Sequence, residues 1–183
     1  MQFQSILEVS FVPAQRTLSD IKLYLFAFAF ALGNLLLPMA VHTIPSGGMI
    51  FLPLFFFTLI AAYSDGLLAG ILVALLSPLL NHAVTGMPAL IMLPTVLFKS
   101  LLVAGLAALV SERLRKISFL AIAGIVIAMQ VFGGLFDYFI SGNAARAIAS
   151  VTLGFPGMVI MTILGYALLR VIANMREEGS VSK

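Results

Sequence analysis

Three polar side chains interrupt long apolar stretches of this sequence, and their types and spacing suit them to chemistry. Lys99 lies about ten residues into an apolar run, which corresponds to ~15 Å along a helix. Gln130 and Asp137 are seven residues apart in a later run, so they share one face of a helix. An ammonium group, an amide and a carboxylate can together hold a polar solute through charge and hydrogen bonds. These residues therefore predict a binding site rather than a reaction centre.

The composition indicates which solvent surrounds these residues. Of the 183 residues, 62% are hydrophobic and 9% are charged, whereas soluble proteins have roughly 45–50% apolar and about 25% charged residues. The sequence therefore indicates an integral membrane protein, in which a charged residue inside a span is a candidate functional residue. The basic residues are scattered, which argues against a nucleic-acid surface, and the lack of cysteine excludes disulfides and thiolate chemistry.

Six apolar runs approach or reach the length of ~20 residues that a helix needs to cross a bilayer. The runs are continuous rather than alternating, which predicts helices and not barrel strands. We expect an all-α membrane domain of six transmembrane helices over 21–174, after a cytoplasmic or interfacial segment 1–20 and before a cytoplasmic tail 175–183. A short interfacial helix is expected within residues 3–11, and a tight turn at 63–66. The predicted spans are 21–41, 48–63, 66–80, 89–110, 118–140 and 148–173.

The positions of lysine and arginine predict the orientation. With six spans, both termini lie on the same side of the membrane. In the opposite loops only Arg146 is basic, and Lys99 lies inside a span. The positive-inside rule therefore predicts that both termini are cytoplasmic. The basic residues on that side are Arg16, Lys22, Arg113, Arg115, Lys116, Arg170, Arg176 and Lys183.

Other polar residues lie in the outer halves of the spans and in outward loops that contain Gly and Pro. Thr95 shares a helix face with Lys99, Gln130 is level with Lys99, and Asp137 lies ~10 Å nearer the outside. We expect a polar cavity from the outer surface to mid-membrane. The alternatives are solvated loops, amides that join helices, and a Lys99–Asp137 ion pair with no ligand. The candidate substrate-binding residues are Asn34, His42, Asn81, His82, Thr85, Thr95, Lys99, Gln130, Asp137, Asn143 and Arg146.

Small residues form two stripes on the first predicted span. Ala27 and Ala31 lie on one face, and Ala29 and Gly33 lie on nearly the opposite face. Such small-xxx-small spacing lets another helix approach closely. Two stripes on one helix predict one neighbour inside the domain and another in a different subunit. Residues 66–70 repeat the spacing with two glycines, which is also consistent with packing inside the domain.

Enzyme motifs are missing from the sequence. There is no Gly-x-x-x-x-Gly-Lys-Ser/Thr phosphate loop, so the chain is not expected to hydrolyse ATP by itself. His42 and His82 stand apart from each other and from any carboxylate cluster that could hold a metal. No Ser-His-Asp set is evident. We therefore expect no enzyme activity, no cofactor and no metal.

In these features the chain resembles the S components, the substrate-binding membrane subunits of energy-coupling factor (ECF) transporters, which import vitamins and related micronutrients in prokaryotes. The resemblance rests on size, six spans with both ends inside, the Ala27-x-x-x-Ala31 stripe and the passage 77–88 (SPLLNHAVTGMP). It implies a subunit of the prokaryotic cytoplasmic membrane that binds substrate from outside. It also implies docking on a transmembrane coupling subunit driven by two ATPase subunits, with Ala27 and Ala31 matching the docking motif and Ala29 and Gly33 as a second register.

The expected substrate is a vitamin-like small molecule, and the span residues suggest its charge. A cationic ligand would favour aromatic faces and acidic partners. The chain has no tryptophan and carries Lys99 near mid-membrane, which favours a carboxylate, a phosphate or another electron-rich group. The main alternative is a scaffold of the rod-shape (MreD) family, which has similar size and span count and need hold no ligand. An ion pathway or membrane enzyme would need carboxylate or histidine relays, which the sequence lacks.

Overall fold

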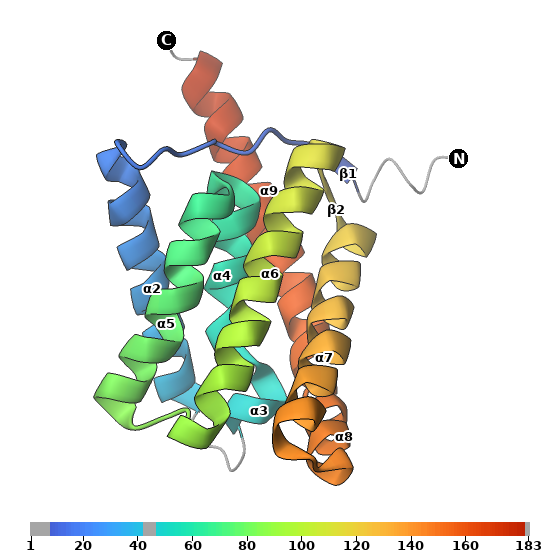
Figure 1. Cartoon of the computed structure of the whole chain (residues 1–183). Coiled ribbons are helices and arrows are strands. Elements are labelled where there is room, and N and C mark those ends of the chain that lie inside the picture. Colours follow the sequence, from blue (N-terminus) through green and yellow to red (C-terminus); the bar gives the residue numbers. More distant parts are fainter. Residues whose placement is uncertain (1–7, 42–46, 182–183) are drawn as a thin grey trace.

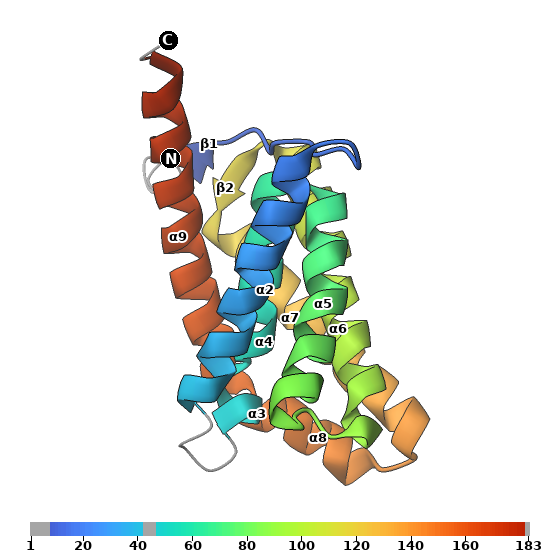
Figure 2. The ribbon, with the colours of Figure 1, turned by 90° about the vertical axis from the view of Figure 1, so that its left-hand side faces the viewer.

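The computed structural model describes residues 8–41 and 47–181. The chain runs up and down a helical bundle, and β1, β2 and the C-terminal end of α9 lie at the same end (Figures 1 and 2). We call this end the strap end and the opposite one the cavity end. The elements are β1 (Glu8–Ser10), α2 (Ile21–Val41), α3 (Gly47–Phe51), α4 (Pro53–Asp65), α5 (Leu67–Thr85), η1 (Leu90–Met92), α6 (Leu93–Leu114), β2 (Lys116–Ser118), α7 (Phe119–Ser141), α8 (Ala144–Leu153) and α9 (Phe155–Val181).

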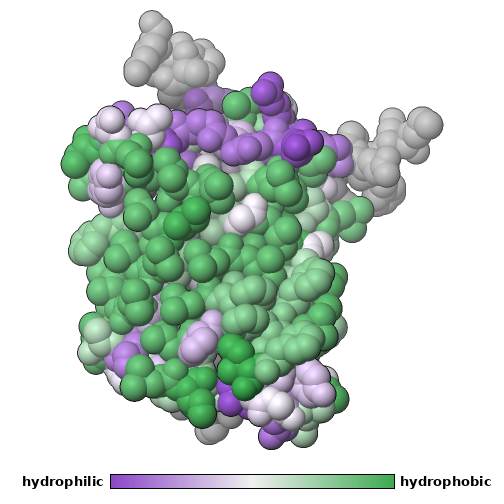
Figure 3. Space-filling model, in the orientation of Figure 1, coloured by the Kyte–Doolittle hydropathy of each residue, from purple (hydrophilic) through white to green (hydrophobic). Residues whose placement is uncertain are grey.

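Within the described residues, five helical segments are long and apolar enough to cross a membrane. They are Ile21–Ala40, Leu67–Thr85, Leu90–Leu114, Phe119–Ser141 and Phe155–Glu178. The face shown in Figure 3 is apolar over most of its height, and hydrophilic residues gather across its strap end. Side chains that face hydrocarbon must be apolar, whereas those at the bundle ends meet water. The chain is therefore a multi-pass, helical membrane protein, as the composition predicted.

The second predicted span, 48–63, is broken, and its main helix is short. Pro53 lacks an N–H and disfavours a helical conformation at the preceding residue, and Leu52 is left-handed, with φ 51°. The break separates α3 from α4, which has 13 residues, ten of them buried. α4 packs against α2, α5, α6 and α9. Because its neighbours are helices rather than lipid, α4 need not match the bilayer thickness.

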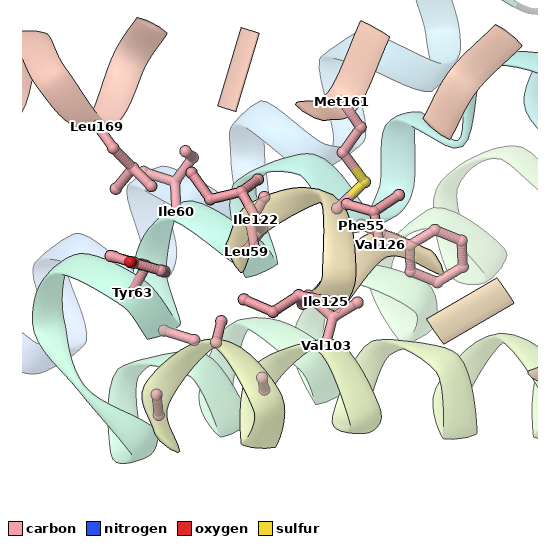
Figure 4. Close-up of a cluster of buried hydrophobic side chains, with 14 of the residues drawn as sticks. Phe55, Leu59, Ile60, Tyr63, Val103, Ile122, Ile125, Val126, Met161 and Leu169 are labelled. Atoms are coloured by element: carbon pink, nitrogen blue, oxygen red, sulfur yellow. The ribbon is translucent and has the colours of Figure 1, made fainter. Parts of the chain in front are cut away.

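Apolar side chains from α4, α6, α7 and α9 form the main core. Figure 4 shows them converging, with Leu59 and Ile60 from α4, Val103 from α6, Ile122 from α7 and Leu169 from α9. All five of these side chains are fully buried. In a membrane the surrounding lipid is as apolar as these side chains, so close van der Waals packing between the helices, rather than removal from water, stabilises this core. The core therefore fixes how α6 and α7 lie against each other, and these two helices carry Lys99 and Gln130.

Within the described residues, the N-terminal segment forms a strand and an extended strap from residue 8 onward, whereas residues 3–7 of the expected interfacial helix lie outside the described residues. Glu8–Ser10 pairs antiparallel with Lys116–Ser118. Residues 11–20, which we call the strap, then cross the end of the bundle to α2 (Figure 1). Asp20 Oδ1 accepts the Lys22 backbone N–H at 2.9 Å, at the start of α2. This hydrogen bond lowers the pKa of Asp20.

Three other helix boundaries differ from the prediction. The sixth predicted span, 148–173, is two helices: α8 ends at Leu153 and α9 begins at Phe155. The third predicted span continues to Thr85 as α5, although Pro78 lies inside it. The expected turn at 63–66 is smaller than predicted, because α4 continues to Asp65 and only Gly66, with φ 88°, separates it from α5. A positive φ suits glycine because it has no Cβ.

Candidate functional site

A small cavity lies at the cavity end, among the helices that carry the predicted polar residues. Its volume is about 100 Å³. Helix α6 contributes one wall, α7 and α8 contribute a second, and the α3–α4 break contributes an apolar third. The lining residues are Gly48, Leu52, Phe55, Met92, Thr95, Val96, Lys99, Asp137, Arg146 and Ser150. Four of the predicted binding residues therefore line one cavity.

Lys99 is the more enclosed of the two cationic side chains that line this cavity, with 4% of its surface exposed. Its Nζ donates to Gln130 Oε1 at 2.8 Å and to Ser150 Oγ at 3.0 Å. Gln130 Nε2 donates in turn to the Ser150 backbone oxygen at 3.1 Å. Because both ends of the Gln130 amide have partners of the matching kind, the amide is held in one orientation. Helices α6, α7 and α8 are thus joined around one ammonium group.

Asp137 forms a second group one to two turns nearer the cavity end. Its Oδ1 accepts from Thr95 Oγ1 at 3.0 Å and from an Arg146 terminal nitrogen at 2.9 Å. Only 3% of Asp137 is exposed. The predicted relative depths agree with these contacts, since antiparallel helices bring Thr95 to Asp137 and Lys99 to Gln130. The Lys99–Asp137 ion pair considered as an alternative is not among the ion pairs of the described residues, because Asp137 pairs with Arg146 instead.

Two glycines make room for this network. A Cβ at Gly133 would collide with the Lys99 side chain at Cε and Cγ, and a Cβ at Gly154 would collide with Gln130 Nε2. Side chains at these positions would therefore displace the ammonium or the amide. Gly154 also separates α8 from α9.

Asn143 acts on the site through the helix that it begins. Its Oδ1 accepts the Arg146 backbone N–H at 3.0 Å and so caps the N-terminus of α8. Arg146 and Ser150 are four residues apart on α8, which places both on the face toward the cavity. The sequence analysis missed Ser150. Its spacing from Arg146 is the signal that could have found it, had the separate helix been recognised.

Asn34 lies in a different polar group, between α2, α4 and α5. Its Nδ2 donates to Thr58 Oγ1 at 3.1 Å and to Ser77 Oγ at 3.0 Å, and its Oδ1 accepts the Phe57 backbone N–H at 3.0 Å. Asn81 Nδ2 donates to the Asn34 backbone oxygen at 2.9 Å. That oxygen is four residues before Pro38, which has no N–H to offer it. Asn34 and Asn81 do not line the cavity, and their contacts fit helix packing.

His82 and Thr85 hold the connection between α5 and α6. His82 Nδ1 lies 2.9 Å from the Pro88 backbone oxygen, and Thr85 Oγ1 donates to the Asn81 backbone oxygen at 2.7 Å. Neither side chain lines the cavity. His42, the other histidine among the candidates, lies outside the described residues.

A second buried carboxylate lies at the strap end, and the sequence analysis gave it no role beyond a turn. Asp65 is 2% exposed. Its Oδ1 accepts from Arg16 Nε at 3.1 Å and from an Arg176 terminal nitrogen at 3.2 Å, and its Oδ2 accepts from Ser64 Oγ at 2.7 Å. Arg16 belongs to the strap and Arg176 to α9, so this cluster fastens both to the end of α4.

The two small-residue stripes of α2 lie in different surroundings. Ala27 and Ala31 are buried inside the chain, and Ala27 packs with Ala61 and Val73. Ala29 is exposed and Gly33 is half-buried beneath Phe57. The stripe that matches the docking motif thus forms internal contacts, and the other register is the more accessible one. Gly70 likewise lies against Ala62 of α4, which is packing inside the domain.

The chain was also compared with known proteins. No family model, no curated protein and no solved structure matches it.

Proposed function

We propose that this protein is the substrate-binding membrane subunit of an importer of the ECF type, an S component that captures a vitamin or related micronutrient. The observation that carries the proposal is the cavity around Lys99, which is lined by polar groups on α6, α7 and α8 and by apolar groups on the α3–α4 break. Concave sites with an apolar wall and a few convergent polar groups are typical of small-molecule binding.

The groups around the cavity favour binding over reaction. The ammonium of Lys99 and the guanidinium of Arg146 can hold a polar solute through charge and hydrogen bonds. The other polar lining groups, Thr95, Ser150 and Asp137, already contact these cations or each other. Such a set of groups can recognise a solute without changing it.

The proposed arrangement in the membrane follows the distribution of basic residues. The strap end, with Arg113, Arg115 and Lys116, would face the cytoplasm of a prokaryotic cell, and the cavity end would face outward. Solute would then be captured from outside and released inside. Release would depend on a coupling subunit and two ATPase subunits, because this chain has no phosphate-loop motif. On the folded chain, the coupling subunit would meet α2 at the Ala29 register more readily than at Ala27 and Ala31.

Native mass spectrometry of the gently purified protein tests the proposal. We expect a retained small molecule in the unaltered protein and its loss in Lys99→Ala. The matched control is Lys22→Ala, which removes an exposed lysine at the start of α2 and should leave the bound mass in place. An unchanged bound mass in Lys99→Ala would contradict the assignment of the site.

The same experiment addresses the alternative of a membrane scaffold of the rod-shape type. A scaffold needs no small ligand, so it would be empty after purification from cells grown in vitamin-rich medium. Repeated absence of a bound small molecule would favour the scaffold and count against an S component.

A further inference from the structure

Lys99 has one more hydrogen-bond donor than the described residues supply acceptors for. An ammonium group has three N–H donors, and the described residues provide two acceptors, Gln130 Oε1 and Ser150 Oγ. Both acceptors are neutral. The side chain is almost fully buried and lines the cavity. A buried cation with neutral partners and a spare donor is costly in a membrane protein, unless a further group binds to it.

The charges around the cavity do not balance. Lys99 and Arg146 are cationic, and among the described residues that line the cavity Asp137 is the one acidic side chain. Two positive charges and one negative charge leave an excess of one positive charge. Asp137 is already engaged by Arg146, and no ion pair within the described residues includes Lys99. The group that would complete this site is therefore an anion.

Arg146 offers a second donor to such an anion. One of its terminal nitrogens is bound to Asp137, but its Nε is buried and has no hydrogen-bond partner among the described residues. An unpaired buried donor is costly, because it loses its hydrogen bonds to water and gains none in the protein. Lys99 and Arg146 thus both line the cavity with unused hydrogen-bonding capacity.

Charge and size together select the kind of anion. A single negative charge would neutralise the cluster, whereas a dianionic phosphate would leave it with excess negative charge in a low-dielectric site. A cavity of about 100 Å³ holds a planar carboxylate and a few carbon atoms, since one water molecule takes about 30 Å³. The apolar wall formed by Leu52, Phe55 and Val96 suits the carbon atoms.

We infer that the ligand of this cavity carries a single carboxylate, which accepts hydrogen bonds from the free donor of Lys99 and from Arg146. Its negative charge brings the net charge of Lys99, Arg146, Asp137 and the ligand to zero. The inference rests on the proposed function for the claim that the cavity holds a solute. It adds the chemical class of that solute: a monoanionic carboxylate, rather than a phosphate, a neutral molecule or a cation.

Pairs of carboxylates and their amides test the inference, because the two members differ in charge and hardly in shape. Acetate, butyrate and benzoate are added at matched concentrations to the purified protein, and each is compared with acetamide, butyramide or benzamide. The thermal unfolding midpoint is followed by circular dichroism. A ligand that binds the folded state raises this midpoint. We expect at least one carboxylate to raise it by a few degrees in a saturable way, and its amide to be at least tenfold weaker.

Variants show whether the effect depends on Lys99. Lys99→Met keeps an unbranched side chain and removes the charge, so the carboxylate-induced rise should disappear when measured against the variant alone. Lys22→Met is the matched control at an exposed lysine and should keep the rise. Equal effects of carboxylate and amide, no effect of any carboxylate, or an undiminished rise in Lys99→Met would each overturn the inference.

The outcome can be separated from that of the proposed function. If native mass spectrometry finds a neutral, cationic or dianionic ligand that is lost in Lys99→Ala, the solute-binding function stands and the carboxylate inference is wrong. If no ligand is retained and no carboxylate raises the midpoint, both are wrong.

Discussion

The two ends of the bundle each contain a buried aspartate that is bound by arginine, but the two aspartates are used differently. At the strap end, both oxygens of Asp65 accept hydrogen bonds, from Arg16 and Arg176 on one side and from Ser64 on the other. At the cavity end, Oδ1 of Asp137 accepts from Thr95 and Arg146, while Oδ2 accepts no hydrogen bond from the described residues. One carboxylate is saturated by the chain, and the other is not.

This difference separates a structural ion cluster from a binding site. A buried ion pair is a weak source of stability, but breaking one is costly because it leaves a charge without compensation. The Asp65 cluster joins the strap, α4 and α9, which are far apart in the sequence. Both oxygens of its carboxylate accept hydrogen bonds from the surrounding Arg16, Arg176 and Ser64. The Asp137 group lies beside a cavity and an ammonium with a free donor. Incomplete coordination, rather than burial or charge alone, distinguishes the candidate site.

The largest expected effect is on stability at the strap end. Asp65→Asn removes the negative charge that holds two arginines and is expected to lower the free energy of unfolding by about 3 kcal/mol. Unfolding in denaturant, followed by circular dichroism, measures the change. The carboxylate-induced rise in the unfolding midpoint should be unaltered, because Asp65 lies at the opposite end from the cavity.

Asp137→Asn provides the matched variant at the cavity end. It removes one arginine partner rather than two, and the Arg146 side chain is partly exposed, so we expect a loss of about 1–2 kcal/mol. A loss as large as that of Asp65→Asn would contradict the distinction between the two ends. The distinction would also be contradicted if Asp65→Asn abolished the carboxylate-induced rise in the unfolding midpoint.

The sequence was sufficient to predict the helical membrane class and that Gln130 is level with Lys99, whereas the contact between Thr95 and Asp137 was not predicted. Apolar runs long enough to span a bilayer indicate that lipid surrounds the helices. The number of residues along two antiparallel helices gives the relative depth of their side chains, and Lys99 is level with Gln130 just as Thr95 is level with Asp137. The position of a residue along a helix does not determine which neighbouring helix its side chain will contact. Asn34 was therefore expected at the cavity, whereas α2 packs on α4 and α5 and takes Asn34 with it.

Other features were missed because hydropathy does not reveal a break between two apolar helices. Residues 144–173 form a nearly continuous apolar run, in which Gly154, Pro156 and Gly157 are the signals of the boundary between α8 and α9. Without that boundary, Ser150 looked like any serine within a span. Asp65 was missed for another reason: its arginine partners are 49 and 111 residues away in the sequence. Tertiary packing brings these residues together, and local spacing gives no sign of it.

An intermediate effect, on binding rather than on stability, is expected at Gly133. In Gly133→Ala the new Cβ would collide with the Lys99 stem, so the ammonium must move away from the cavity. We expect the apparent affinity for the best carboxylate to fall about tenfold, which corresponds to ~1.4 kcal/mol. Titration of the unfolding midpoint against carboxylate concentration measures the affinity.

Gly124→Ala is the control for this variant. Gly124 also lies on α7, but a Cβ there meets nothing within 4 Å, so alanine should leave the affinity unchanged and favour the helix slightly. Equal carboxylate affinities in the two variants would show that the position of Lys99 does not matter for binding.

The smallest expected effect concerns the helix that presents Arg146 and Ser150. Asn143→Ala removes the N-cap of α8 and is expected to cost about 1 kcal/mol of stability. Because both α8 residues that line the cavity depend on where this helix begins, the carboxylate affinity should fall a few-fold as well, whereas the Asp65 cluster should be unaffected. Asn143→Ser retains a capping oxygen and should restore both stability and affinity. If serine restored stability but not affinity, α8 would be tied to the site by something other than its cap. If Asn143→Ala changed neither stability nor carboxylate affinity, the N-cap would not be needed to position α8. The contacts of α8 with Lys99, Gln130 and Asp137 would then be sufficient to hold it.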